Sequence, residues 1–135
     1  PLGTGGALRF ALPKLEPNFL LANGDSFFDF NLRALRPPPA GGVTMALRAT
    51  APGDRYGTVE LLDGRVCRFH SAGGSRDAPI NAGIYLLDRE VAAVVPAGKV
   101  SLEQDLFPQL AADGRILGDV FDGFFIDMGV PEDLA

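Results

Sequence analysis

The sequence predicts an α/β domain built on a mixed, mainly parallel sheet with an appended β-hairpin. Apolar runs alternate with helical segments and turn signals along the chain, and the run "NFLLAN" at 18–23 is nearly continuous, as in strands buried on both faces. This run stops at an Asn-Gly-Asp turn, and open α/β sheets bind ligands just beyond the carboxyl ends of their strands. Asp25 therefore lies where such a sheet places its chemistry.

The first elements follow from local signals. "PLGTGGAL" predicts a glycine-rich turn ahead of an amphipathic helix in "LRFALPKL", and such a turn either offers N–H groups to an anion or is only a flexible connection. After the strand at 18–23, "FNLRALR" predicts a short helix that ends before the prolines at 37–39. "GGVTMALRAT" predicts a strand, and "YGTVELLDGRVCRF" predicts a hairpin around Asp63-Gly64.

The second half continues the alternation. "HSAGGSRDAP" predicts a loop, "INAGIYLL" a further sheet strand and "DREVAAVV" a short helix before Pro96. "SLEQDLFPQLAADG" has the helix-capping pattern of Ser101 and Gln104, and then a helical spacing of apolar residues that ends at Gly114. "RILGDVFDGFFIDMG" predicts two short strands, and Pro131 the start of a helix.

Composition limits the function. The 135 residues are enough for one core and too few for two ordinary domains. A net charge of -5 argues against a nucleic-acid-binding protein, since those spread basic residues over a face. The single cysteine, Cys67, is interpreted as a strand residue. No apolar run approaches the roughly 20 residues that span a bilayer, and no signal peptide is recognised, so a cytoplasmic protein without membrane partners is expected.

Six motifs occur along the chain in the order "PLGTGGAL", "FLLANGDSFFDFNL", "RYGTVELLDGRV", "INAGIYLLDREV", "SLEQDLFPQL" and "GFFIDMGVPEDL". In these motifs and in their order, the sequence resembles the sugar-1-phosphate nucleotidyltransferase family. They are most similar to the branch that makes GDP-heptose from D-glycero-D-manno-heptose 1-phosphate, with mannose-1-phosphate guanylyltransferases close by. The resemblance implies a Rossmann-like, GT-A-like fold. The family's opening glycine-rich nucleotide loop and Pro-Lys pair have no counterpart, so residues 1–135 are expected to be the C-terminal part of one nucleotidyltransferase domain, inactive alone.

The resemblance also implies a reaction. A sugar 1-phosphate attacks the α-phosphorus of a nucleoside triphosphate, GTP being expected, and pyrophosphate leaves. Asp25 and Asp127 match the family's ligands for Mg²⁺, a hard ion that one or two carboxylates can hold. Each also has a structural interpretation, Asp25 as a helix cap and Asp127 as a turn residue. If they share one ion, their carboxylates should lie about 4 to 6 Å apart.

Other positions are implied motif by motif. The nucleotide base and ribose are assigned to Gly3, Thr4 and Gly5. The sugar pocket is assigned to Tyr56, Gly57, Asn81, Ala82 and Gly83. The alternatives are structural: a tyrosine at a strand start, and a buried asparagine that caps a strand.

One departure from the family pattern follows the hairpin. The family carries Phe-x-Glu-Lys there, whereas this chain reads "RFHSAGGSR". His70 stands near the expected glutamate and is either a partner for a sugar hydroxyl or a polar loop residue. The positive charge for the sugar phosphate would then come from Arg68 or Arg76.

Three classes of function compete on this sequence: a magnesium-dependent nucleotidyltransferase, a degenerate paralogue that binds a nucleotide sugar and regulates a partner, and a structural module completed by another chain. The residues do not distinguish heptose from mannose or guanine from other bases. They allow a homo-oligomer.

Overall fold

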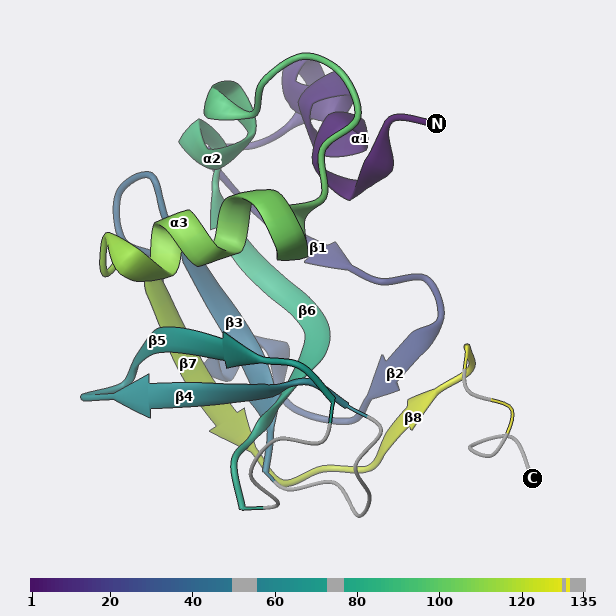
Figure 1. Ribbon diagram of the computed structural model, residues 1–135, viewed down its shortest axis with the longest axis vertical. Helices are drawn as coiled ribbons and strands as arrows, with labels where there is room; N and C mark the ends of the chain where they lie inside the picture. Colours follow the sequence, from purple (N-terminus) through teal and green to yellow (C-terminus); the bar gives the residue numbers. More distant parts are fainter. Residues whose placement is uncertain (50–55, 73–76, 130, 132–135) are drawn as a thin grey trace.

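The computed structural model describes residues 1–49, 56–72, 77–129 and 131 (Figure 1). The strands are β1 (Asn18–Ala22), β2 (Ser26–Phe28), β3 (Val43–Arg48), β4 (Thr58–Leu62), β5 (Arg65–His70), β6 (Ile80–Asp88), β7 (Ile116–Phe121) and β8 (Phe125–Asp127). The helices are α1 (Gly3–Ala11), α2 (Arg89–Val94) and α3 (Phe107–Ala112), with 3₁₀ turns at Leu12–Lys14 and Leu32–Ala34 and a π-helical turn at Leu102–Leu106. Among the described residues, none of the helices has the length and apolar composition that a membrane-spanning helix needs.

Six strands form one sheet in the order β1-β6-β3-β7-β5-β4, and β2 and β8 form a separate two-stranded ribbon. The predicted mixed sheet and hairpin are confirmed, but the expectation of mainly parallel strands is wrong for the described residues. Among the described strands, β3 and β7 alone pair in parallel, whereas β6 runs antiparallel to β1, β3 and β4. A continuous apolar run indicates that both faces of a strand are covered, but it does not indicate whether the adjacent strand runs parallel or antiparallel.

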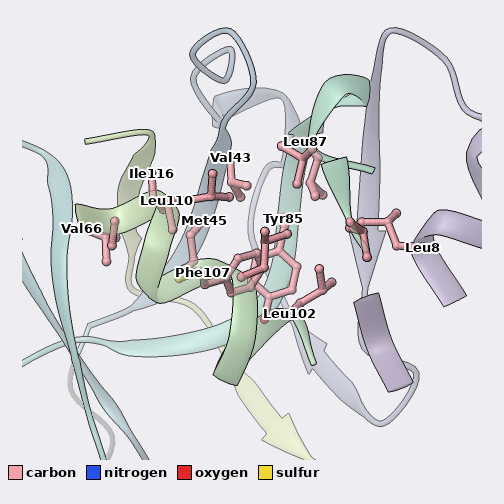
Figure 2. Packing of buried hydrophobic residues seen from close by; sticks show 14 of the residues in the cluster. Leu8, Val43, Met45, Val66, Tyr85, Leu87, Leu102, Phe107, Leu110 and Ile116 are labelled. Carbon is pink, nitrogen blue, oxygen red and sulfur yellow. The ribbon is translucent and has the colours of Figure 1, made fainter. Parts of the chain in front are cut away.

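The main hydrophobic core lies between one face of this sheet and the helices (Figure 2). The Tyr85 ring from β6 packs against Phe107 at the start of α3, with ring centroids 5.1 Å apart. Leu102 and Leu110 are buried in the same core, as the predicted helical spacing requires. The opposite face is covered by a smaller cluster around Phe28 of β2.

The glycine-rich opening is part of α1 and not a turn ahead of it, which corrects the expectation. Gly5 and Gly6 are buried, and a β-carbon on Gly5 would come within 2.8 Å of Val100 Cγ1. A β-carbon on Gly6 would lie 2.7 Å from the Gly98 carbonyl oxygen. The glycines therefore let the helix approach the chain at 98–100, a tertiary contact that overrides their weak helix propensity.

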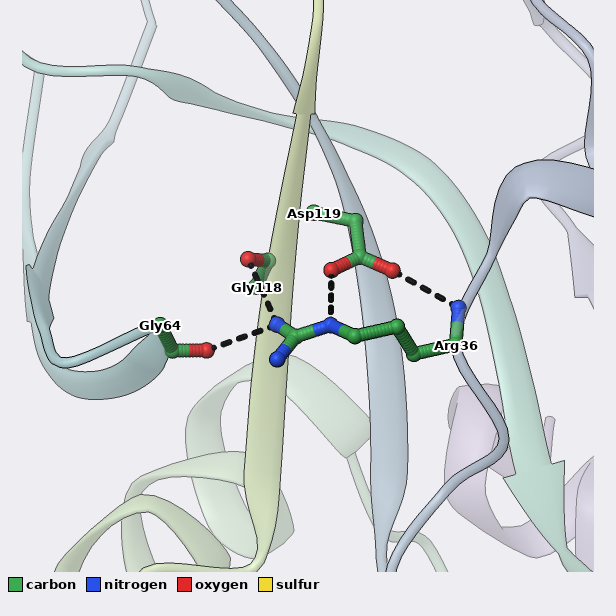
Figure 3. Close-up of polar contacts among 4 residues, drawn as sticks. All are labelled: Arg36, Gly64, Gly118 and Asp119. Carbon is green, nitrogen blue, oxygen red and sulfur yellow. Dashed lines mark hydrogen bonds and ion pairs between the residues drawn. The ribbon is translucent and has the colours of Figure 1, made fainter.

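The expected hairpin turn is present, with φ of 51° at Asp63 and 75° at Gly64. These are the left-handed conformations of a two-residue hairpin loop. Arg36 anchors this turn from a distant segment (Figure 3). Its Nη2 donates to the Gly64 and Gly118 carbonyl oxygens at 3.0 and 3.2 Å, while its Nε donates to Asp119 Oδ1. The long connection between β2 and β3 is thereby fixed to β7 and the hairpin.

Other predicted features fall into place around the sheet. Ser101 caps the π-helical turn by accepting a hydrogen bond from the Gln104 N–H at 3.1 Å, as the capping pattern predicts. Cys67 is an exposed residue of β5. The helix expected after Pro131 falls on residues 132–135, outside the described part of the chain.

Candidate functional site

The turn after β1 brings the two predicted aspartates together. Asn23, Gly24 and Asp25 lead directly from β1 into β2, and β2 pairs antiparallel with β8. Ser26 lies opposite Asp127 in this pairing, and Asp25 is the residue immediately before Ser26. Residues about 100 positions apart in the sequence thus meet at one end of the β2–β8 ribbon.

Distances measured from Gly129 give an upper limit for the separation of the two carboxylates. A β-carbon on Gly129 would lie 3.1 Å from Asp127 Oδ1 and 3.2 Å from Asp25 Oδ2. The two oxygens are therefore at most about 6.3 Å apart, the sum of these distances. This limit excludes the separation beyond roughly 10 Å at which no single ion could bridge them.

The two aspartates differ in their surroundings. Asp25 is exposed, and its Oδ1 lies 3.5 Å from the Ser26 hydroxyl that donates to it. Asp127 is half-buried, and its Oδ1 accepts a hydrogen bond from the Gly129 N–H at 2.9 Å. The turn contact anticipated for Asp127 is thus present, and it uses an oxygen that faces the same glycine as Asp25.

The carboxylate pair is a suitable donor set for Mg²⁺, which commonly takes one or two carboxylates and completes its shell with phosphate oxygens and water. Within the described ranges, no group of three or more histidine, cysteine, aspartate or glutamate side chains could hold a metal. A site with two protein ligands therefore fits these residues better than a closed, all-protein metal cage.

An open pocket of about 480 Å³ adjoins Asp25 and is lined by Thr4, Asn23, Gly24, Asp25 and Glu103. Thr4 faces this pocket from α1, and its hydroxyl donates to Glu103 Oε2 at 3.0 Å while accepting from the Leu102 N–H at 2.8 Å. Gly5 is buried against Val100 and donates its N–H to the Val100 carbonyl oxygen. Of the three residues assigned to the nucleotide, Thr4 is the one that lines the pocket, and Gly3 precedes it with φ of 70°.

The predicted sugar-binding segment of β6 runs beside the Asn23 turn. The Asn23 N–H donates to the Gly83 carbonyl oxygen at 2.8 Å, and a β-carbon on Gly83 would lie 2.7 Å from Asn23 Nδ2. Gly83 has φ of 74°, so both its conformation and its neighbour favour glycine. The Ala82 side chain is buried in the smaller core cluster.

Asn81 makes hydrogen bonds within β6, as expected if its role is structural. Its Nδ2 donates to the Tyr85 hydroxyl at 2.9 Å, and its Oδ1 accepts from the Gly83 N–H at 2.9 Å. These bonds use one of the two N–H donors of Nδ2 and leave the second N–H for another acceptor. Burial raises the pKa of Tyr85, the Asn81 hydrogen bond opposes this, and the charge of Glu103 adds to the rise.

The remaining predicted residues lie at the hairpin. The Tyr56 ring contacts Phe125 of β8 edge-on with centroids 5.8 Å apart, and Gly57 packs against the His70 backbone. His70 Nε2 lies 3.2 Å from Glu60 Oε2 on the paired strand, and both side chains are about half exposed. Arg68 is exposed on β5. Arg76 lies outside the described residues.

Three residues that line the pocket are not among the predicted site residues: Asn23, Gly24 and Glu103. Asn23 belongs to the Asn-Gly-Asp turn that drew attention to Asp25, so the motif contained its signal. Glu103 belongs to the capped segment after Ser101, where a glutamate in a first helical turn needs no functional explanation. Its place beside Thr4 depends on a contact between residues 99 positions apart.

No family model matches the sequence. Among curated proteins, D-glycero-alpha-D-manno-heptose 1-phosphate guanylyltransferase from Aneurinibacillus thermoaerophilus is 34% identical over 138 residues, and the Campylobacter jejuni protein of the same name is 36% identical. Both alignments cover 98% of this chain. The catalytic subunit beta of mannose-1-phosphate guanylyltransferase from Dictyostelium discoideum is 30% identical over 145 residues. The chain spans 60% of the length of the first two relatives and 39% of the third.

The chain also superposes on solved structures. HddC from Yersinia pseudotuberculosis superposes with a TM-score of 0.85 at 28% identity, over 99% of this chain and 60% of that one. The same protein complexed with GMP-PN gives a TM-score of 0.84. The inositol-1-phosphate CTP transferase from T. maritima has a TM-score of 0.72 at 16% identity, which shows a shared fold alone.

Proposed function

The chain is homologous over nearly its whole length to the sugar-1-phosphate nucleotidyltransferases, and on this premise we propose that the protein in which it occurs is such an enzyme. It transfers a nucleotidyl group from a nucleoside triphosphate to a sugar 1-phosphate and releases pyrophosphate. The names of the relatives favour GTP with heptose or mannose 1-phosphate. The GMP-PN complex of HddC gives further support for a guanine nucleotide.

One observation carries this proposal: Asp25 and Asp127 face the same glycine at the end of the β2–β8 ribbon, beside an open pocket. In our proposal these carboxylates hold Mg²⁺, and when bound the ion offsets the negative charge of the reacting phosphates. The charge argument is general, because nucleotidyl transfer depends on positioning and charge stabilisation more than on covalent chemistry.

The pocket residues have distinct proposed roles. Thr4, with the backbone at Gly3 and Gly5, receives the nucleoside end of the triphosphate. Asn81, with the close backbone at Ala82 and Gly83, receives the sugar, and the second N–H of Asn81 is the donor it offers. Both segments adjoin the turn that carries Asp25, which supports placing the two substrates around that carboxylate.

We place the outer part of the sugar pocket at the hairpin. Tyr56 and Gly57 are proposed to line it, since Tyr56 contacts the strand that leads to Asp127. His70 would donate to a sugar hydroxyl in exchange for its exposed contact with Glu60. Arg76 is proposed to meet the sugar phosphate, with Arg68 as the alternative cation.

The test uses the complete protein that contains this sequence, incubated with Mg²⁺, GTP and either heptose or mannose 1-phosphate. Pyrophosphate release that requires both substrates and the metal is the expected result. GTP hydrolysis that is independent of the sugar phosphate, or no release with any nucleoside triphosphate, would contradict the proposal. Replacement of GTP by UTP, CTP or dTTP measures the base preference.

A further inference from the structure

Glu103 is held in the pocket by a network that uses one side of its carboxylate. Glu103 Oε2 accepts hydrogen bonds from the Thr4 hydroxyl at 3.0 Å and from the Ser101 hydroxyl at 3.2 Å. Thr4 is itself fixed, because its Oγ1 accepts from the Leu102 N–H at 2.8 Å. The carboxylate is thus anchored to both α1 and the π-helical turn, and its orientation is set before any ligand arrives.

The second oxygen, Glu103 Oε1, has no hydrogen-bond partner among the described residues. Glu103 is half-buried and lines the same pocket as the Asn23–Asp25 turn. Its charge also reaches the buried Tyr85 hydroxyl, whose pKa it helps to raise. A fixed, partly desolvated carboxylate with one open acceptor is suited to a ligand that donates hydrogen bonds.

The charges around the pocket limit what that ligand is. Among the residues that the structure describes, its lining includes two carboxylates, Asp25 and Glu103, and no lysine or arginine. A phosphate group against Glu103 would be repelled, whereas a neutral hydroxyl would donate to it.

We propose that Glu103 Oε1 binds a pair of neighbouring hydroxyls on the sugar part of a substrate. The inference rests on the proposed function and adds a specificity residue to it. Two sources share this chemistry, the ribose of the nucleoside triphosphate and the ring of the sugar 1-phosphate. Glu103 contributes affinity for a hydroxylated ring and takes no part in the transfer of the nucleotidyl group.

The test compares Glu103→Gln with the unchanged complete protein. Glutamine keeps an oxygen for the Thr4 and Ser101 hydroxyls and removes the charge. We expect KM for one substrate to rise about tenfold or more, since hydrogen bonds to charged groups are the stronger ones, with kcat and the Mg²⁺ requirement little changed. Glu16→Gln, at an exposed position away from the pocket, is the matched control.

Deoxy substrates identify the source. If the ribose is bound, 2′- or 3′-deoxyguanosine triphosphate should lose affinity in the unchanged protein and not lose it further in Glu103→Gln. If the sugar 1-phosphate is bound, monodeoxy sugar phosphates should show this pattern instead. Equal losses for all substrates, deoxy or not, would overturn the inference, as would a raised Mg²⁺ requirement, which would make Glu103 a metal ligand.

Failure of the proposed function gives a different result. In that case the unchanged protein releases no pyrophosphate at all. Calorimetric titration with GTP and 2′- or 3′-deoxyguanosine triphosphate, and with each sugar phosphate and its monodeoxy form, then tests Glu103 by binding alone. A preference for the hydroxylated ligand that Glu103→Gln removes supports the inference, and its absence overturns it.

Discussion

The Asp25 carbonyl oxygen accepts a hydrogen bond from the Met128 N–H at 2.7 Å, so the turn that carries Asp25 is joined through the backbone to the end of β8, which carries Asp127. Ser26, the residue after Asp25, also pairs with Asp127 itself in the β2–β8 ribbon. The relative position of the carboxylates therefore does not depend on their own side-chain contacts. Substitution of either carboxylate should leave this frame in place.

Asp25→Asn should lower pyrophosphate release by the complete protein about a hundredfold or more, because the amide keeps the shape of the side chain but loses the charge that holds Mg²⁺. Asp127→Asn should have a similar effect. Pyrophosphate release measured over a Mg²⁺ titration, together with the melting temperature, checks this. Asp122→Asn, at an exposed position of the loop between β7 and β8, is the control and should retain activity. Full activity of Asp25→Asn would refute the metal assignment.

Gly83→Ala should destabilise the protein by more than backbone strain alone. At φ of 74° an alanine costs about 1 to 2 kcal/mol, and the added carbon would also lie 2.7 Å from Asn23 Nδ2. Gly114→Ala is a matched control, since Gly114 has φ of 69° and no described residue beyond its chain neighbours lies within 4 Å of the new carbon. Chemical denaturation of both variants should show the larger loss at Gly83.

The clash and the strain can be separated within Gly83→Ala itself. Asn23→Ala removes the side chain that the new methyl group meets, so it should recover part of the loss in the double variant. Equal destabilisation by Gly83→Ala and Gly114→Ala, with no recovery from Asn23→Ala, would show that Asn23 does not confine this position.

The parts of the fold that sequence predicted well are those with local causes. The hairpin follows from Asp63-Gly64, because these two residues adopt the required left-handed conformations more easily than others. The cap at Ser101 is also local, since its partner Gln104 is three residues away. Strand direction and the place of the glycines in α1 were predicted wrongly, because both depend on partners far along the chain.

The candidate site divides in the same way. Asp25 and Asp127 were singled out because each ends an apolar run within a motif that resembles the nucleotidyltransferase family. The structure brings them together through strand pairing. Glu103 was not found, because its partner Thr4 lies at the other end of the sequence. His70 illustrates the reverse case, a residue singled out by its type that contacts Glu60 on the hairpin surface.

Arg36→Ala should lower the free energy of unfolding by about 1 to 2 kcal/mol. The change removes an ion pair with Asp119 and two hydrogen bonds to the Gly64 and Gly118 carbonyl oxygens, and the guanidinium is half exposed, which moderates the cost. Arg36→Lys should recover little of it, since an ammonium cannot reproduce the planar fork. Urea denaturation measures the effect, with the exposed Arg33→Ala as control.

A double-mutant cycle with Asp119→Asn isolates the Arg36–Asp119 contact from the carbonyl contacts. Coupling of about 0.5 kcal/mol or more between the two changes is expected, because Asp119 is largely buried by Arg36 and its neighbours. Strict additivity would mean that the ion pair contributes nothing measurable and that the carbonyl contacts alone fix the loop.

The last prediction concerns pH. Burial raises the pKa of Tyr85 above its ordinary value of 10.0, so the folded protein keeps the phenol protonated at a pH where the unfolded chain has lost this proton. The stabilisation that comes from burying the neutral phenol is complete below pH 10 and declines as the pH rises from there towards the folded-state pKa. The free energy of unfolding should therefore fall above pH 10.

Tyr85→Phe isolates this contribution from other groups that titrate in the same range. The variant should be less stable at neutral pH by about 1 kcal/mol, because the Asn81 amide loses its acceptor, and its stability should fall less steeply above pH 10. Urea denaturation at several pH values, with phenolate absorbance recorded in parallel, measures both effects. Identical slopes in the two proteins would contradict the raised pKa, since a tyrosine that titrates equally in the folded and unfolded states adds no pH dependence.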